Sequence, residues 1–248
     1  MKICNILTPG FRSPNGQAFL FPLIKWRNQL KDSGIKLNFY NQFKDYISDC
    51  DFIIIDNKFF SPFWKNESEK IKKKIFKLSQ KNKNIFWFDI TDSTGWDHTK
   101  PLRYVKALVK NQVLKNKNLY LRPIYANGRV YADYYFSKCK IEDSSPSWSI
   151  PILNKLDLNK IKVGWNSGIA NYSLYGPIST YIIGKYLSKY LLNFSKKYTS
   201  AFCERRNDIS CRYGIEYERE SVAYQRVKIN KILKLQSTQK IKRASYFN

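Results

Sequence analysis

The fold is decided by the run Asp51-Phe52-Ile53-Ile54-Ile55-Asp56 and by the similar run Asn84-Ile85-Phe86-Trp87-Phe88-Asp89. The first run is apolar on both of its alternating faces, as central strands of parallel sheets are, because helices cover such sheets on both sides. Between the two runs, Lys65–Lys83 places apolar residues at helical spacing among many lysines, which predicts a basic helix. A strand, a helix and a second strand joined by short loops predict a parallel sheet.

The same alternation extends toward the N-terminus. Lys2–Leu7 and Ile35–Tyr40 are predicted strands, and Gln17–Asp32 between them is a predicted helix that Ser33 and Gly34 end. On the other side, a helix is expected from Pro101, since proline favours the first helical position. The pattern therefore predicts an α/β protein with a Rossmann-like, doubly wound parallel sheet.

The pattern begins again after residue 160. Lys160–Trp165 is a predicted strand, and helices are predicted over about Ser179–Leu192 and near Glu220–Leu235. We therefore expect a Rossmann-like first domain over residues 1–145, a linker over 146–159 and a second α/β domain over 160–248. The second domain has one predicted strand, so it is expected to be incomplete, as the beginning of a longer unit, or else to be a helical appendage.

The charge of the chain suggests an anionic partner. Among 248 residues, Lys and Arg number 44 and Asp and Glu 19, a formal net charge of +25. Such a field attracts nucleic acid, anionic lipid head groups and nucleotide sugars. The alternative is a compositional bias of the gene toward Lys, Asn and Ile. Mean hydropathy is −0.50, and the start has no signal-peptide pattern, so a cytoplasmic location is expected.

The numbers of cysteine and histidine residues argue against a metal centre. The five cysteines are scattered without a C-x-x-C pair, and His98 is the only histidine. An ordinary zinc site is therefore not expected, and the cysteines are interpreted as small buried apolar residues. Asp49-Cys50-Asp51 spells D-x-D, a metal-binding motif of some sugar transferases, but it begins a strand instead of ending one. No metal site is predicted.

The loop that follows Asp89 holds the candidate catalytic residues Asp92, Asp97 and His98. It comes directly after a predicted parallel strand, and ligands of open α/β sheets bind at the carboxyl ends of strands. A carboxylate or an imidazole there can act as a general base that removes a proton from an attacking hydroxyl. The alternative is that the aspartates cap turns and helices and that His98 is solvated.

Two further features can contact a ligand. Asn15-Gly16 sits between a strand and a helix, where backbone N–H groups can face an anionic or hydroxylated group, although an ordinary turn explains it equally. Arginines cluster at Arg205, Arg206 and Arg212, and guanidinium groups bind phosphate and carboxylate in a fork. Their alternative role is pairing with acids on a solvated face.

Several segments together resemble a family of bacterial glycosyltransferases with two Rossmann-like domains (the GT-B type), which occurs in surface-polysaccharide gene clusters. These segments are Asp92–Gly95, Gly128–Tyr135, Val163–Gly168, Arg205–Arg219 and Ser221–Arg226. The resemblance implies transfer of a sugar from a nucleotide-sugar donor to a glycan or lipid-linked acceptor, without a cofactor or an obligatory metal.

The resemblance also implies roles for individual residues. Asp97, His98 or Asp92 would deprotonate the acceptor, and the clustered arginines would neutralise the donor diphosphate. The acceptor would contact Asn15, Gly16, Asn166, Ser167 and Gly168. The basic helix over Lys65–Lys83 would face an anionic membrane if the acceptor is lipid-linked. In members of this family the donor-binding half continues beyond the point that corresponds to residue 248.

Two other functions fit parts of the sequence. Net charge +25 and 16% aromatic residues would suit a nucleic-acid-binding protein that contacts phosphates and stacks on bases. Against this, Phe86, Trp87 and Phe88 lie inside an apolar strand, where they are expected in the core. The third possibility is a folded remnant of a transferase without catalytic activity.

Overall fold

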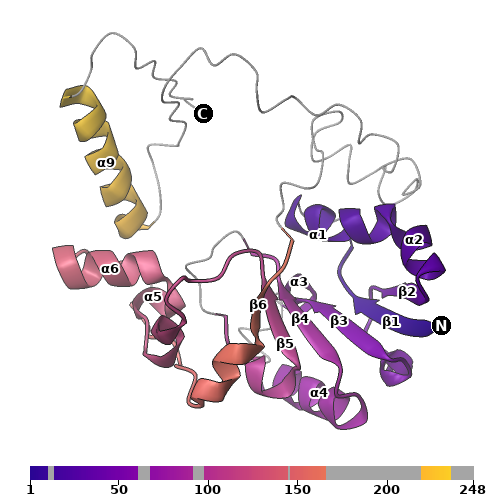
Figure 1. Cartoon of the computed structure of the whole chain (residues 1–248). Helices are drawn as coiled ribbons and strands as arrows, with labels where there is room; N and C mark the ends of the chain where they lie inside the picture. Colours follow the sequence, from indigo (N-terminus) through magenta and orange to yellow (C-terminus); the bar gives the residue numbers. More distant parts are fainter. Residues whose placement is uncertain (11–13, 61–67, 92–97, 145, 166–218, 236–248) are drawn as a thin grey trace, which may run out of the picture. The chain divides into compact units, whose positions relative to one another are not determined.

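The structure is a computed structural model that describes residues 1–10, 14–60, 68–91, 98–144, 146–165 and 219–235. Its main feature is a six-stranded sheet in which every neighbouring pair is parallel (Figure 1). The strands are β1 (Lys2–Leu7), β2 (Ile35–Tyr40), β3 (Phe52–Asp56), β4 (Ile85–Asp89), β5 (Ala107–Lys110) and β6 (Ile161–Val163). The predicted α/β class and doubly wound sheet are confirmed.

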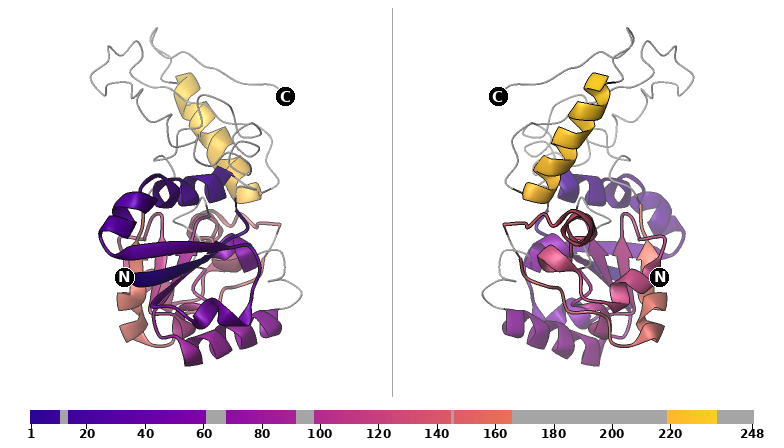
Figure 2. Two further views of the ribbon diagram at one scale, coloured as in Figure 1. Left: turned by 90° about the vertical axis from the view of Figure 1, so that its right-hand side faces the viewer. Right: turned by 90° about the vertical axis from the view of Figure 1, so that its left-hand side faces the viewer.

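The strand order is β2-β1-β3-β4-β5-β6. The chain thus reverses its direction across the sheet between β1 and β3, as in flavodoxin-like sheets, whereas dinucleotide-binding sheets have the order 3-2-1-4-5-6. Helix α1 (Pro14–Lys25) follows β1 and helix α4 (Ser68–Lys81) precedes β4. Because right-handed crossovers in opposite directions lie on opposite faces, α1 and α4 cover opposite faces of the sheet (Figure 2).

The α4 face of the sheet holds the larger core. Side chains of α4 pack there on alternate residues of the central strands, including Ile53, Ile85, Trp87 and Leu108. These four strand residues are at most 4% exposed. The short helices of the connections that lead to β3, β4, β5 and β6 lie on the same side. They are η1 (Asp45–Ser48), α3 (Asn57–Phe60), η2 (Leu102–Tyr104), η3 (Lys117–Leu121) and η4 (Lys155–Lys160).

The α1 face is packed by the other alternate set of strand residues. Phe19, Leu20, Leu23 and Ile24 of α1 bury Cys4 and Ile6 of β1. The predicted single helix over Gln17–Asp32 is divided in two, since α1 ends at Lys25 and α2 spans Arg27–Asp32. Pro22 lies inside α1, three residues before its end. Pro22 has no N–H to donate to residue 18, but its carbonyl still accepts the N–H of Trp26 at 3.0 Å, so the helical bonding extends to the junction with α2.

Two expectations from the sequence differ from the structure. The helix expected from Pro101 is the single turn η2, followed by strand β5, whose four residues are all buried. The strand predicted to open a second domain is β6, which pairs with β5 and so extends the first sheet. Periodicity identifies a strand but not the sheet that it joins, because pairing uses backbone groups that every residue carries. Residues 166–218, which hold most of the predicted second α/β domain, lie outside the described part.

A second compact unit comprises residues 122–151 and the described residues 219–235. It contains α5 (Tyr125–Gly128), α6 (Val130–Cys139) and α9 (Glu220–Leu235). The two sequence segments are joined by polar contacts, one buried and one partly buried. Ser221 donates its hydroxyl to Asp143 at 2.8 Å, and Arg219 donates to the Tyr131 hydroxyl oxygen at 2.6 Å.

Candidate functional site

Three neighbouring strands of the sheet each end in a charged residue that is buried. Asp56 ends β3, Asp89 ends β4 and Lys110 ends β5, and they are between 0 and 2% exposed. Because the strands are parallel, these ends lie at the same edge of the sheet, which is the edge where α/β proteins bind ligands. A buried charge is costly unless it is paired, so each of these groups needs partners.

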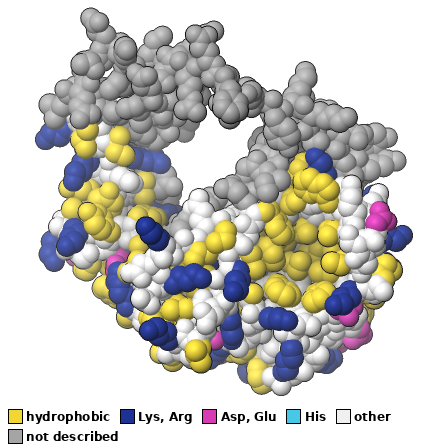
Figure 3. Space-filling view, viewed as in Figure 1, with side chains coloured by type: hydrophobic (Ala, Val, Ile, Leu, Met, Phe, Trp, Pro, Cys, Tyr) yellow, Lys and Arg dark blue, Asp and Glu magenta, His cyan; other side chains and the backbone are white. Residues whose placement is uncertain are grey.

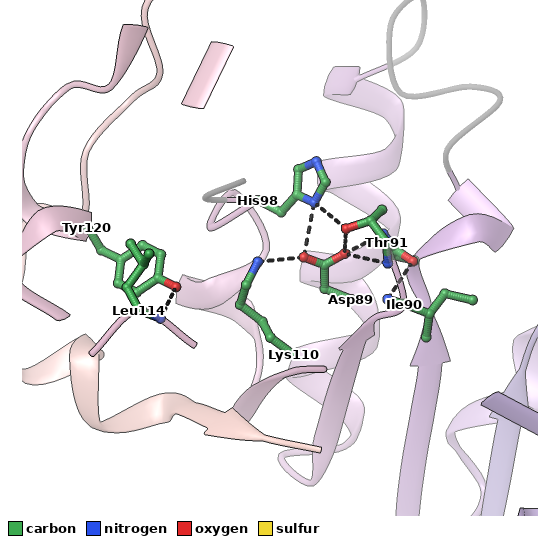
Figure 4. Close-up of polar contacts among 8 residues, drawn as sticks. Asp89, Ile90, Thr91, His98, Lys110, Leu114 and Tyr120 are labelled. Carbon is green, nitrogen blue, oxygen red and sulfur yellow. Dashed lines mark hydrogen bonds and ion pairs between the residues drawn. The ribbon is translucent and has the colours of Figure 1, made fainter. Parts of the chain in front are cut away.

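Asp89 is the centre of a polar cluster (Figure 4). Lys110 Nζ lies 2.6 Å from its Oδ2, and His98 Nδ1 lies 3.0 Å from the same oxygen. The side chains of Lys110 and Asp89 are 2% and 1% exposed, whereas that of His98 is 25% exposed. The histidine is therefore the member of this group with the greatest access to solvent.

The second oxygen of Asp89 is bound by neutral donors. The Thr91 hydroxyl donates to Oδ1 at 2.6 Å, and Asn57 Nδ2 donates to it at 3.0 Å. The Asn57 side-chain oxygen in turn accepts the backbone N–H of Ile90 at 3.2 Å. Both carboxylate oxygens are thus held in place by side chains from β5, from the turn after β3 and from the loop after β4.

These contacts set the ionisation of Asp89. Burial by itself raises the pKa of this carboxyl, but the hydrogen bond with His98 and the positive charge of Lys110 outweigh it. The pKa of Asp89 therefore lies well below its usual range. The carboxylate is ionised at neutral pH and can only accept hydrogen bonds.

The ionised carboxylate decides the tautomer of His98. Since Asp89 only accepts, Nδ1 of His98 carries the hydrogen, and Nε2 of the neutral ring carries the basic lone pair. The backbone of His98 has a positive φ of 41°, which is unfavourable for a residue with a side chain. Surrounding contacts must hold a residue in this conformation, as the contact with Asp89 does for His98. This arrangement can take up a proton at Nε2 and stabilise the resulting imidazolium through Asp89.

Asp56 forms a second buried carboxyl site on the α1 face. Its Oδ2 accepts the Thr8 hydroxyl at 2.9 Å, and its Oδ1 accepts the backbone N–H of Lys58 at 2.8 Å. The positive charge of the Lys58 side chain also acts on this carboxyl. Burial outweighs the two hydrogen bonds and this charge, and it raises the pKa of Asp56 to about 6.

The raised pKa of Asp56 predicts a specific pH dependence of stability. The folded protein holds this proton more tightly than the unfolded chain, so the contribution is complete below about pH 4 and is lost as pH rises through about 6. Two pKa units correspond to about 3 kcal/mol. Asp56→Asn keeps the shape of the side chain without the titration. Urea unfolding measures the free energy of unfolding of both proteins at pH 4 and pH 8. Relative to the native protein, the variant should be about 3 kcal/mol more stable at pH 8 than at pH 4.

A matched variant separates this effect from changes elsewhere. Asp51→Asn removes an exposed carboxylate just before the same strand. In the native protein, Oδ2 of Asp51 accepts the Ile3 N–H. Its stability difference from the native protein should not follow the pH dependence of the Asp56 variant. If the free energy of unfolding of Asp56→Asn differed from that of the native protein by the same amount at both pH values, ionisation of Asp56 would have no effect on stability.

Of the candidate residues predicted from the sequence, the structure places three. His98 lies in the Asp89 cluster, and Asn15 and Gly16 lie in the first turn of α1, which begins at the carboxyl edge of the sheet. The remaining candidates lie outside the described residues: Asp92, Asp97, Asn166, Ser167, Gly168, Arg205, Arg206 and Arg212.

Other members of the site were not predicted from the sequence. Lys110 was missed because its strand was interpreted as part of a helix, and Asn57 and Thr91 because a lone polar residue after a strand is common. A signal was present in the chain, since three short apolar runs end in Asp56, Asp89 and Lys110. Opposite charges at the ends of adjacent parallel strands can pair, but adjacency is known only from the sheet order.

Two kinds of feature are absent from the described part of the chain. No group of three or more His, Cys, Asp or Glu side chains in it is arranged to hold a metal ion. None of its helices combines the length and the apolar composition needed to cross a membrane. Comparisons of the chain with protein-family models, curated proteins and solved structures found no match.

Proposed function

We propose that this chain is a glycosyltransferase of the GT-B type whose first sheet binds the acceptor and whose His98 acts as the general base. The observation that carries the proposal is the 3.0 Å contact between His98 Nδ1 and the buried carboxylate of Asp89 at the carboxyl edge of a parallel sheet. The contact orients the imidazole and leaves Nε2 as its proton-accepting atom. The segments that resemble GT-B enzymes supply the substrate class.

The proposed reaction is a displacement at the anomeric carbon of a nucleotide sugar. An acceptor hydroxyl gives its proton to Nε2 of His98 while its oxygen forms a bond to that carbon. The bond from the carbon to the diphosphate oxygen breaks, and the nucleoside diphosphate leaves with the electron pair. Asp89 stabilises the imidazolium, and the hydrogen bond from Lys110 keeps the Asp89 carboxylate in position.

The other predicted residues have supporting roles in this proposal. Arg205, Arg206 and Arg212 would neutralise the leaving diphosphate, so no metal ion is required. Asn15 and Gly16, at the start of α1, would contact the acceptor together with Asn166, Ser167 and Gly168. No cofactor takes part, since the nucleotide sugar is a substrate.

A screen of the whole chain tests the substrate class. The protein is incubated with a panel of nucleotide sugars, and melting temperature and release of nucleoside diphosphate are measured. One nucleotide sugar should raise the melting temperature, since a ligand that binds the folded state stabilises it. Single-stranded oligonucleotides are tested in parallel at physiological salt. Micromolar binding of oligonucleotides without any response to nucleotide sugars would instead show a nucleic-acid-binding protein.

We further propose that the acceptor is lipid-linked and that α4 contacts the cytoplasmic face of an anionic membrane. Lys70, Lys73, Lys77 and Lys81 are exposed on α4, and Phe76 among them is 51% exposed. A lysine near such a surface contributes about 1 kcal/mol, and salt screens it. The protein should float with vesicles containing anionic lipid at low salt and be released at high salt.

Charge-removing variants locate this contact. Lys73→Gln with Lys77→Gln should reduce the fraction bound at low salt several-fold, since two of the four lysines are lost. Lys36→Gln with Lys162→Gln removes two exposed lysines from the edge strands and should leave the fraction almost unchanged. A contact through α4 would be contradicted if the two double variants lost the same fraction of vesicle binding, or if flotation of the native protein did not depend on salt.

A further inference from the structure

The α1 face of the sheet is incompletely covered, unlike the α4 face. On β3 and β4 the residues that face α4, such as Ile53 and Ile85, are buried, whereas the alternate apolar residues are partly exposed. The partly exposed set consists of Phe52, Ile54, Phe86 and Phe88. Figure 3 shows hydrophobic side chains gathered over the strands beside α1. We call this set the open face.

The dimensions of the elements explain why the face is open. Six strands about 4.8 Å apart make a sheet about 24 Å wide, whereas one helix with its side chains is about 10–12 Å across. In the described chain α1 is the helix that packs on this face. Parallel sheets are normally covered on both faces, because both of their faces are apolar. One more element of helical width is therefore needed over β3 and β4.

The described crossovers after β3 cannot supply this element. From β3 onward the strands follow one another in a single direction across the sheet, so right-handed connections all fall on the α4 face. Leu102, Tyr120 and Leu158, which come from the connections before β5 and β6, are indeed part of the core on that face. A segment that covers the open face must come from outside these connections.

Trp165 shows where the chain goes after the last strand. Its ring lies 5.5 Å from that of Phe19 on α1 and 4.8 Å from that of Phe88 on β4, measured between centroids. Both of these rings belong to the α1 face. The chain therefore turns onto the α1 face directly after β6, at the border of the open face.

We propose that the open face is the docking surface for the segment 179–192 of this same chain, packed as an amphipathic helix beside α1. This segment lies outside the described residues, and its sequence predicts a helix. Apolar residues recur at positions 182, 183, 186, 187, 190 and 191, and lysines at 185 and 189 fall between them. The thirteen residues between Trp165 and Ser179 can span roughly 40 Å, which exceeds the width of the sheet.

Hydrogen exchange of the whole chain tests this docking. Amides of residues 179–192 should exchange at least ~10-fold more slowly than in an unfolded chain, because a docked helix must open before its amides exchange. Leu187→Asp places a charge on the apolar side of the segment and should remove this protection. It should also increase the binding of a hydrophobic dye, since the open face becomes accessible, while peptides from α4 exchange as before. Ser188→Asp changes the polar side and is the matched control.

A substitution on the sheet provides the reciprocal test. Phe86→Asp should remove the protection of residues 179–192, whereas Phe76→Asp, on the exposed side of α4, should leave it. Exchange of 179–192 at the unfolded rate in the native protein would overturn the proposal. Protection that depends on protein concentration, together with a dimeric mass by light scattering, would overturn it in favour of a second copy of the chain.

Discussion

Lys110→Met is expected to lower the free energy of unfolding by about 3–5 kcal/mol, the range measured when one partner of a buried ion pair is removed. The variant keeps an unbranched apolar chain in place of the lysine stem, so little volume is lost. What it removes is the cation 2.6 Å from Asp89, whose carboxylate then remains buried with neutral donors and His98. Urea unfolding at pH 7 measures the loss.

The control for this variant lies four residues away. Lys106 is exposed and donates its Nζ to Asn84 Oδ1 at 2.8 Å. Lys106→Met should change stability by no more than about 0.5 kcal/mol, as surface substitutions usually do. The double variant Lys110→Met with Asp89→Asn should cost less than the sum of its two single changes, because the second change removes the uncompensated charge. Equal effects at Lys110 and Lys106 would show that the buried pair is unimportant for stability.

His98→Ala is expected to lower the rate of sugar transfer by about 10²–10⁴-fold, the contribution typical of a general base. The prediction follows from the proposed function and is measured as release of nucleoside diphosphate from the nucleotide sugar that the screen identifies. Added imidazole should restore part of the activity, because a small base can occupy the space that the side chain left. A purely structural role of His98 would not produce this rescue.

The residues around His98 make the test more specific. Lys100→Ala, two residues further along the same loop and exposed, should leave the rate almost unchanged. Asp89→Asn acts through His98, since it alters the atom that fixes the tautomer, so it should lower the rate without changing the binding of the nucleotide sugar. Full activity of His98→Ala with the correct substrate would rule out this histidine as the base.

The two buried carboxyls show how strongly the environment sets ionisation at one edge of the sheet. Asp56 and Asp89 both end apolar strands, and in sequence they look alike. Asp89 has Lys110 and His98 in direct contact and a lowered pKa, whereas Asp56 accepts hydrogen bonds from the Thr8 hydroxyl and the Lys58 backbone N–H and has a pKa of about 6. Strand β5 contributes to the difference, because its pairing with β4 places Lys110 beside Asp89.

The alternation of apolar runs and helices was sufficient to predict β1, β2, β3, β4 and the parallel sheet that they form. This succeeded because a strand buried on both faces must be apolar on both, and such runs are rare outside parallel sheets. Strand β5 was missed, since Ala107–Lys110 is only four residues long and follows a proline that also suits a helix. Four residues are too few for periodicity to distinguish the two.

By itself, the sequence determined the fold class, the position of His98 after a central strand and the strong positive charge of the chain. These properties depend on residue type and local spacing. The tertiary structure alone decided that β6 completes the first sheet, that Lys110 and His98 bind the same oxygen of Asp89, and that one face of β3 and β4 is left partly exposed. Such features depend on which strands become neighbours. Strands pair through backbone groups that every residue carries, so no single segment of sequence shows which strand lies beside it.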